Sequence, residues 1–106
     1  MKMIDLVAYF RNGGTFEDFC KMQALDSRSE VIEIYAQAPV SLDSQLGFFP
    51  IEETGGQAEV VSDGIKYQTL FDVVYFLEVI GERKGRESLG DAELAQILIS
   101  YALKDA

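Results

Sequence analysis

The sequence contains no histidine and only one cysteine. The absence of histidine removes the commonest general base and the commonest metal ligand of proteins. Cys20 has no partner for an intrachain disulfide, and its phenylalanine and methionine neighbours predict a buried thiol rather than a nucleophile. We therefore expect a protein without enzymatic activity, metal site or cofactor, located in the reducing environment of the cytoplasm.

Long uninterrupted apolar runs are also missing. Asp72 and Glu78 interrupt the most apolar stretch, which falls far short of the roughly 20 apolar residues that a membrane span requires. The chain does not open with the basic segment and small-residue cleavage site of a secretory signal. We expect a protein that is neither exported by a visible signal nor inserted into a membrane.

Basic residues are scarce. Nine lysines and arginines face eighteen aspartates and glutamates, which gives a formal net charge of -9. Such an excess repels phosphate backbones and anionic lipids and attracts basic proteins, so neither nucleic acid nor membrane is an expected partner. With 106 residues, 48% of them hydrophobic, the chain is expected to form one domain, residues 1–106, around a modest core.

The most apolar stretch runs from Thr69 to Gly85 and carries the start and stop signals of a helix. Thr69 followed by Asp72 is typical of an N-terminal cap, and Gly85 is typical of a C-terminal end. One helical face is apolar and is expected to be buried: Leu70, Val73, Val74, Leu77 and Ile80. We expect this helix to be the centre of the core, with Leu77 fully buried.

Three further helices are predicted. Apolar residues at helical spacing indicate a helix over residues 3–10, ended by Asn12-Gly13-Gly14. Thr15 with Asp18 predicts the cap of a second helix that reaches about Leu25 and forms an αα-hairpin with the first. The last helix begins at Asp91 and is expected to pack beside the central helix through four apolar residues: Leu94, Ile97, Leu98 and Tyr101.

Alternating polar and apolar residues predict four strands, over residues 30–37, 47–53, 57–62 and 65–68. Asp63-Gly64 is a strong two-residue hairpin signal, which pairs Ser62 with Ile65, and Pro50 implies an edge strand or a bulge. A meander is the simplest arrangement. The predicted fold is a single α+β domain in which an αα-hairpin, a four-stranded mainly antiparallel sheet and two C-terminal helices follow one another, the helices packing on one face.

The acidic residues are unevenly distributed. Between Arg28 and Lys66 there are 37 residues, 29 to 65, with no lysine or arginine and with seven acids: Glu30, Glu33, Asp43, Glu52, Glu53, Glu59 and Asp63. We expect helices to cover the sheet face that carries six apolar residues: Ile32, Ile34, Phe49, Ile51, Val60 and Tyr67. Alternation then places the following side chains on the open face: Glu33, Tyr35, Phe48, Glu52 and Glu59.

Aromatic side chains among carboxylates are typical of a tight interface with a cationic partner. The predicted partner-binding residues are Glu30, Glu33, Tyr35, Asp43, Phe48, Glu52, Glu53, Glu59 and Asp63. The alternative is a solvated acidic face that keeps the protein soluble, with Phe48 covered by the loop of residues 38–46.

Two stretches are the most distinctive in the chain: the base-free EVIEIYAQAPVSLDSQLGFFPIEETGGQAEVVSDG and the apolar TLFDVVYFLEVIGE. The profile resembles the small, acidic, histidine-poor immunity proteins of bacterial contact-dependent growth inhibition and other polymorphic toxin systems. This resemblance implies a cytoplasmic inhibitor that binds a basic toxin, typically a nuclease domain, in a one-to-one complex and occludes its active site with acidic side chains. It assigns no role to an individual residue.

Two other classes of function stay open. The first is a general interaction or dimerisation module, such as an antitoxin or an accessory subunit, in which the open face or an edge strand joins another chain or a second copy. The second, ranked last, is a small enzyme that uses carboxylates alone. A pull-down against the product of the neighbouring gene separates an inhibitor from a dimerisation module.

Overall fold

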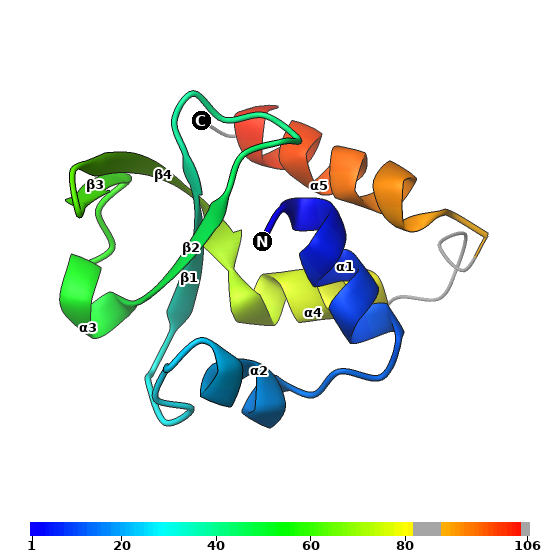
Figure 1. Ribbon diagram of the computed structural model, residues 1–106, viewed down its shortest axis with the longest axis horizontal. Coiled ribbons are helices and arrows are strands. Elements are labelled where there is room, and N and C mark those ends of the chain that lie inside the picture. Colours follow the sequence, from blue (N-terminus) through cyan, green and yellow to red (C-terminus); the bar gives the residue numbers. More distant parts are fainter. Residues whose placement is uncertain (82–87, 105–106) are drawn as a thin grey trace.

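The computed structural model describes residues 1–81 and 88–104 and shows an α+β domain, as predicted (Figure 1). Helices and strands follow in the order α1 (Met3–Arg11), α2 (Phe16–Met22), β1 (Ile32–Gln37), β2 (Leu46–Pro50), α3 (Ile51–Thr54), β3 (Glu59–Ser62), β4 (Ile65–Asp72), α4 (Val73–Gly81) and α5 (Asp91–Lys104). Helices α1, α4 and α5 lie on one side of the sheet and the short α3 lies on the other (Figure 1).

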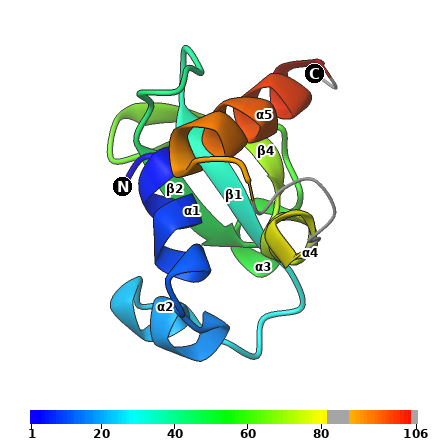
Figure 2. The same cartoon turned by 90° about the vertical axis from the view of Figure 1, so that its right-hand side faces the viewer.

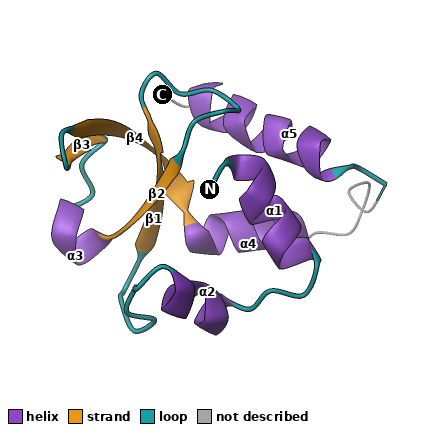
Figure 3. Cartoon of the chain, viewed as in Figure 1, coloured by secondary structure: helices purple, strands orange, loops and turns teal. Residues whose placement is uncertain are grey.

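The four strands form one antiparallel sheet in the order β2-β1-β4-β3 (Figure 3). The expected meander is therefore wrong: two hairpins, β1–β2 and β3–β4, are joined through pairing of β1 with β4, which places β2 and β3 at opposite edges. The reason is that α3 and the loop after it carry the chain away from β2, so that β3 does not pair with it. Pro50 ends an edge strand, as its missing N–H predicts.

The β3–β4 hairpin has the predicted register. Ser62 pairs with Ile65 across Asp63-Gly64, and the two turn residues have φ values of 52° and 78°. Positive φ at both central positions is the geometry of a two-residue hairpin turn, and glycine adopts it without steric cost.

Helix α4 begins three residues later than the sequence predicts. Thr69, the expected cap, lies in β4, and Asp72 caps the helix instead by accepting a hydrogen bond from the amide of Tyr75 at 2.7 Å. Both residues are good caps, but pairing with β1 keeps the chain extended as far as Asp72. The predicted end at Gly85, with Arg83 and Lys84, lies outside the described residues.

The buried face of α4 also differs from the prediction. Val73, Phe76 and Val79 are buried, Val74 is 60% exposed and Leu77 is only partly buried. The prediction that Val74 and Leu77 form the core stripe is therefore wrong. The buried side chains follow the spacing i, i+3, i+6, which is the stripe that meets β1 and α1.

The other helices form the rest of the core. Helix α1 ends before Gly13, whose φ is +97°, and Thr15 caps α2 by accepting a hydrogen bond from the Asp18 amide at 3.2 Å, as predicted. Helix α2 ends at Met22, before Leu25. Figure 2 looks onto this side, where α1, α4 and α5 lie in front of the sheet.

Helix α5 is rotated relative to the prediction. Its buried residues are Leu94, Ala95, Leu98, Ile99 and Ala102. Of the predicted stripe, Leu94 and Leu98 are buried, but Ile97 and Tyr101 are 45% and 42% exposed, so the prediction is wrong for these two. The cause is that α5 packs mainly against α1 and β4 and meets α4 at its margin, where Tyr101 stacks on Tyr75 at a centroid distance of 5.1 Å.

Candidate protein-interaction site

Helix α3 occupies a segment that the sequence predicts to be the end of a strand. Pro50, at φ -61°, is the last strand residue, and Gly55, at the left-handed φ of 65°, ends the helix. The amide of Ile51 donates a hydrogen bond to the carbonyl oxygen of Val31 at 2.8 Å, which fixes the start of α3 beside the start of β1. The strand therefore turns into a helix after Pro50, and Glu52 and Glu53 are helical residues rather than strand residues.

Glu33 fastens α3 to the sheet. The residues on either side of it in β1, Ile32 and Ile34, belong to the main core, so the Glu33 side chain lies on the opposite face. Its carboxylate accepts hydrogen bonds from the hydroxyls of Thr54 at 3.5 Å and Thr69 at 3.2 Å. Thr54 is 9% exposed. Glu33 is thus half-buried beneath α3 rather than open to a partner.

Tyr35 is fully buried, and its predicted place on an open face is wrong. Its hydroxyl donates a hydrogen bond to the carbonyl oxygen of Gln57 at 2.5 Å. Its ring packs edge-on against the ring of Phe49, with 5.3 Å between the two ring centroids. Phe49 in turn packs against Tyr67, with 5.5 Å between the ring centroids. The face expected to be open is therefore covered in part by α3 and the loop after it, and holds a second, smaller aromatic cluster.

Phe48 lies on the main helical side, contrary to the prediction. It pairs with Ile34 across β1 and β2 and therefore shares that residue's face, where its ring meets Phe19 of α2 at 4.8 Å. Phe49, expected under the helices, lies with Tyr35 on the α3 side. The two neighbouring phenylalanines give β2 no visible alternation, and the predicted faces of Phe48 and Phe49 are the reverse of those observed.

Glu30 and Glu52 lie together at the beginning of α3. The amide of Glu30 donates a hydrogen bond to Oε2 of Glu52 at 3.1 Å. This bond, with a second from the backbone amide of Glu52, lowers the pKa of the Glu52 carboxyl below its usual value. Glu52 therefore keeps its negative charge at an exposed helix start, where the free amides also favour an anion.

A groove of about 590 Å³ separates α3 and the following loop from β3. It is lined by the buried Thr54 and the half-buried Phe49 and Val60, together with the exposed acids Glu53 and Glu59. Apolar floor residues with carboxylates beside them offer both desolvated contact and charge to a partner. This groove is the candidate site.

Two further charged residues define the electrostatics of the groove. Lys66, which also lines it, forms an ion pair with Glu59 at 3.2 Å, and both side chains are more than half exposed. Asp63 lies in the adjoining β3–β4 turn and is exposed. Exposed ion pairs of this type contribute little to stability, so Glu59 can exchange Lys66 for a cation of a partner.

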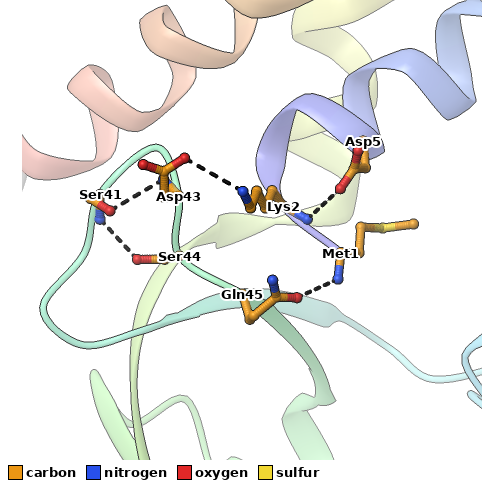
Figure 4. A network of polar contacts seen from close by, with 7 residues as sticks. All are labelled: Met1, Lys2, Asp5, Ser41, Asp43, Ser44 and Gln45. Atoms are coloured by element: carbon orange, nitrogen blue, oxygen red, sulfur yellow. Dashed lines mark hydrogen bonds and ion pairs between the residues drawn. The ribbon is translucent and has the colours of Figure 1, made fainter.

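Asp43 does not belong to this group. It lies in the loop that joins β1 to β2 at the end of the hairpin away from α3, where its carboxylate is 3.6 Å from the ammonium of Lys2 (Figure 4). The loop also contains a hydrogen bond from the Asp43 amide to the Ser41 hydroxyl at 3.2 Å. Of the predicted acids, Glu30, Glu52, Glu53, Glu59 and Asp63 surround α3 and β3, and Asp43 is remote.

Phe49, Thr54 and Gln57 also line the groove and are not among the predicted partner-binding residues. The signal that could have found them is the combination of Pro50 before and Gly55-Gly56 after four residues, which is typical of a short helix. A helix at this place covers the sheet face that alternation alone leaves open.

Comparisons with protein families, with curated proteins and with solved structures found no match to this chain. In the described ranges, no group of three or more cysteine, aspartate or glutamate side chains could hold a metal ion. None of the helices within residues 1–81 and 88–104 has the length and apolar character that crossing a bilayer requires.

Proposed function

We propose that this protein is an immunity protein that binds and inhibits a basic toxin through the groove between α3 and β3. The observation that carries the proposal is the position of the base-free stretch: its acids Glu53 and Glu59 line one groove with an apolar floor, and Asp63 lies in the adjoining β3–β4 turn. Lys66 is the one base that lines the groove within the described residues.

The groove supports binding in two physical ways. Exposed carboxylates attract a cationic partner over about a Debye length, roughly 8 Å at 0.15 M salt, and raise the association rate. Phe49 and Val60, which are half-buried, can lose their remaining contact with water and slow dissociation. The acids would then occupy the positions of nucleic-acid phosphates in the substrate groove of a toxin nuclease.

The test is inhibition of the nuclease domain encoded by the neighbouring gene. We expect the protein to abolish nuclease activity at a one-to-one ratio, with association that slows markedly as salt rises and dissociation that changes little. Replacing Glu53 and Glu59 together with lysine should slow association by about tenfold or more, within the range of electrostatic steering.

The matched control is Glu17→Lys, which reverses an exposed acid on α2, away from the groove. Asp91 is unsuitable because its carboxylate binds Arg11 at 3.1 Å and the exchange would disturb the packing of α1 on α5. If Glu17→Lys impairs inhibition and the Glu53 and Glu59 changes do not, the interface lies on the helical side and the groove is not the binding site.

A further inference from the structure

The two edges of the sheet differ in how they end. At the β2 edge, the amide of Leu46 donates a hydrogen bond to the carbonyl oxygen of Met1 at 2.8 Å, and the ammonium of Met1 bonds Gln45 at 2.6 Å (Figure 4). Pro50, at the other end of β2, has no N–H to offer. Two of the outward-facing positions of this edge, Leu46 and Pro50, therefore offer no free amide to a further strand.

The β3 edge is open. In a two-residue hairpin the pair next to the turn, Ser62 and Ile65, exchanges hydrogen bonds, and every second residue of the strand does the same. The bond from the Thr69 amide to the Ala58 carbonyl oxygen at 2.8 Å fits this alternation. The amides and carbonyls of Glu59 and Val61 therefore point away from β4, along the free edge, and the Val61 side chain is 71% exposed.

The groove runs beside this edge. Val60, Val61 and Ser62 of β3 line it on one side, and Phe49 and Thr54 line it on the other. A chain added to β3 would bring alternate side chains over the groove, as in peptide recognition by strand addition. The edge therefore provides main-chain hydrogen bonds, and the groove provides space for side chains.

Charge decides what kind of chain fits. Glu53, Glu59 and Asp63 contribute three negative charges around the edge and Lys66 one positive charge, a balance of -2. A second copy of this protein, with net charge -9, would bring like charges together, which disfavours pairing of two β3 edges. A basic extended segment meets both the charge and the hydrogen-bonding groups.

We propose that β3 accepts an extended, basic segment of the partner protein as a fifth strand of the sheet, with an apolar side chain in the groove and lysine or arginine beside Glu53 and Glu59. This inference rests on the proposed function, whose partner it describes by structure and charge. It assigns binding to the backbone of Glu59 and Val61 as well as to side chains.

The experiment uses a fluorescent, end-blocked heptapeptide of alternating lysine and valine, with binding measured by fluorescence anisotropy. Two control peptides have the same sequence with N-methyl groups on alternate backbone amides, one peptide for each of the two alternating sets, which keeps the charge and removes strand hydrogen bonds. We expect the unmodified peptide to bind. Of the two N-methylated peptides, the one whose methyl groups replace the amide hydrogens facing β3 should bind about tenfold more weakly, and the other should bind nearly as well as the unmodified peptide. Equal binding of all three peptides, or no binding, would overturn the proposal.

A matched pair of protein variants tests the same edge. Val61→Pro removes an outward amide without removing a bond to β4, whereas Val61→Ala keeps that amide and shortens the side chain. We expect Val61→Pro to weaken peptide binding by about tenfold and Val61→Ala to change it much less. Circular dichroism checks that both variants fold. If Val61→Pro does not fold, the N-methylated peptides still test whether binding uses the backbone of β3.

Two further outcomes keep this proposal distinct from the proposed function. If Val61→Pro folds and inhibits the toxin as well as the unchanged protein, the added strand is refuted while inhibition stands. If the peptide binds as expected but the toxin is not inhibited, the immunity function is refuted while the edge stands. A dimer in size-exclusion chromatography that Val61→Pro dissociates would identify a second copy as the occupant and overturn the proposal.

Discussion

The hydroxyl of Tyr35 donates a hydrogen bond to the carbonyl oxygen of Gln57 at 2.5 Å and so connects the centre of the sheet to the loop that follows α3. Tyr35 is fully buried and Gln57 is exposed. One side chain of β1 therefore determines how closely the loop that lines the groove lies against the sheet.

Tyr35→Phe removes this hydrogen bond and keeps the ring. We expect the free energy of unfolding, measured by urea titration, to fall by about 0.5–1.5 kcal/mol. Tyr35→Ala, which also leaves a cavity beside Phe49, should cost about 3–5 kcal/mol. Gln57→Ala is the control because it preserves the backbone carbonyl, and it should stay close to the unchanged protein. Equal stabilities of Tyr35→Phe and the unchanged protein would show that the bond does not hold the loop.

Phe76 and Leu77 are neighbours on α4 that differ in burial. Phe76 is fully buried and contacts Phe10 at 5.8 Å, whereas Leu77 is only partly buried. Phe76→Ala should therefore lower the free energy of unfolding by about 3–5 kcal/mol, and Leu77→Ala should cost less. Denaturant titration of both variants tests which face of α4 is buried. A larger loss of unfolding free energy for Leu77→Ala than for Phe76→Ala would contradict the observed burial.

The pKa of Glu52 is lowered in the folded state by the amide of Glu30, so the folded protein binds fewer protons than the unfolded chain at moderately acidic pH. The stability contributed by this carboxylate is complete above the ordinary glutamate pKa of about 4.3 and is lost as the pH falls through the lower, folded value. We expect Glu52→Gln to destabilise the protein near neutral pH.

The difference between Glu52→Gln and the unchanged protein should shrink as the pH falls below about 4. Denaturation at a series of pH values measures it. Glu53→Gln removes the same charge from the next residue of α3 and serves as the control. A difference that does not vary with pH would mean that the Glu52 carboxylate is not stabilised by folding.

Cys20 is 1% exposed, and burial raises the pKa of its thiol. A protonated thiol without access to solvent reacts slowly with disulfide reagents. We expect colour development with Ellman's reagent to be much slower in buffer than in denaturant, where the one thiol of the chain should react at once. Rapid reaction of the folded protein would show that α2 opens readily from the core.

The sequence predicts helix and strand well where a local signal has no competitor. Asp63-Gly64 fixes both the turn and the register of β3 with β4, and Thr15 with Asp18 marks the start of α2. These features depend on backbone geometry and capping within a few residues, which local sequence determines.

The sequence fails where distant contacts decide between two local options. Thr69 and Asp72 are both good caps, and only pairing with β1 extends the strand to Asp72. Phe48 and Phe49 are equally apolar, so only their registers with Ile34 and Glu33 reveal which one faces the helices. Of the two predicted aromatic contact residues, Tyr35 is covered because the sequence does not reveal α3 and the loop after it, and Phe48 is covered because it lies on the opposite face, against Phe19 of α2.

The central pairing of β1 with β4 connects residues 33–37 to residues 67–72, so its partners are separated by 30 to 39 positions along the chain. Contacts between positions so distant require closure of a long loop, which slows folding relative to contacts formed within helices or tight turns. During synthesis, the β1–β2 hairpin leaves the ribosome before its second partner strand exists. The edge of β1 that later becomes the middle of the sheet is therefore exposed until β4 has emerged, and for that interval the growing chain is most vulnerable to association with other unfolded chains.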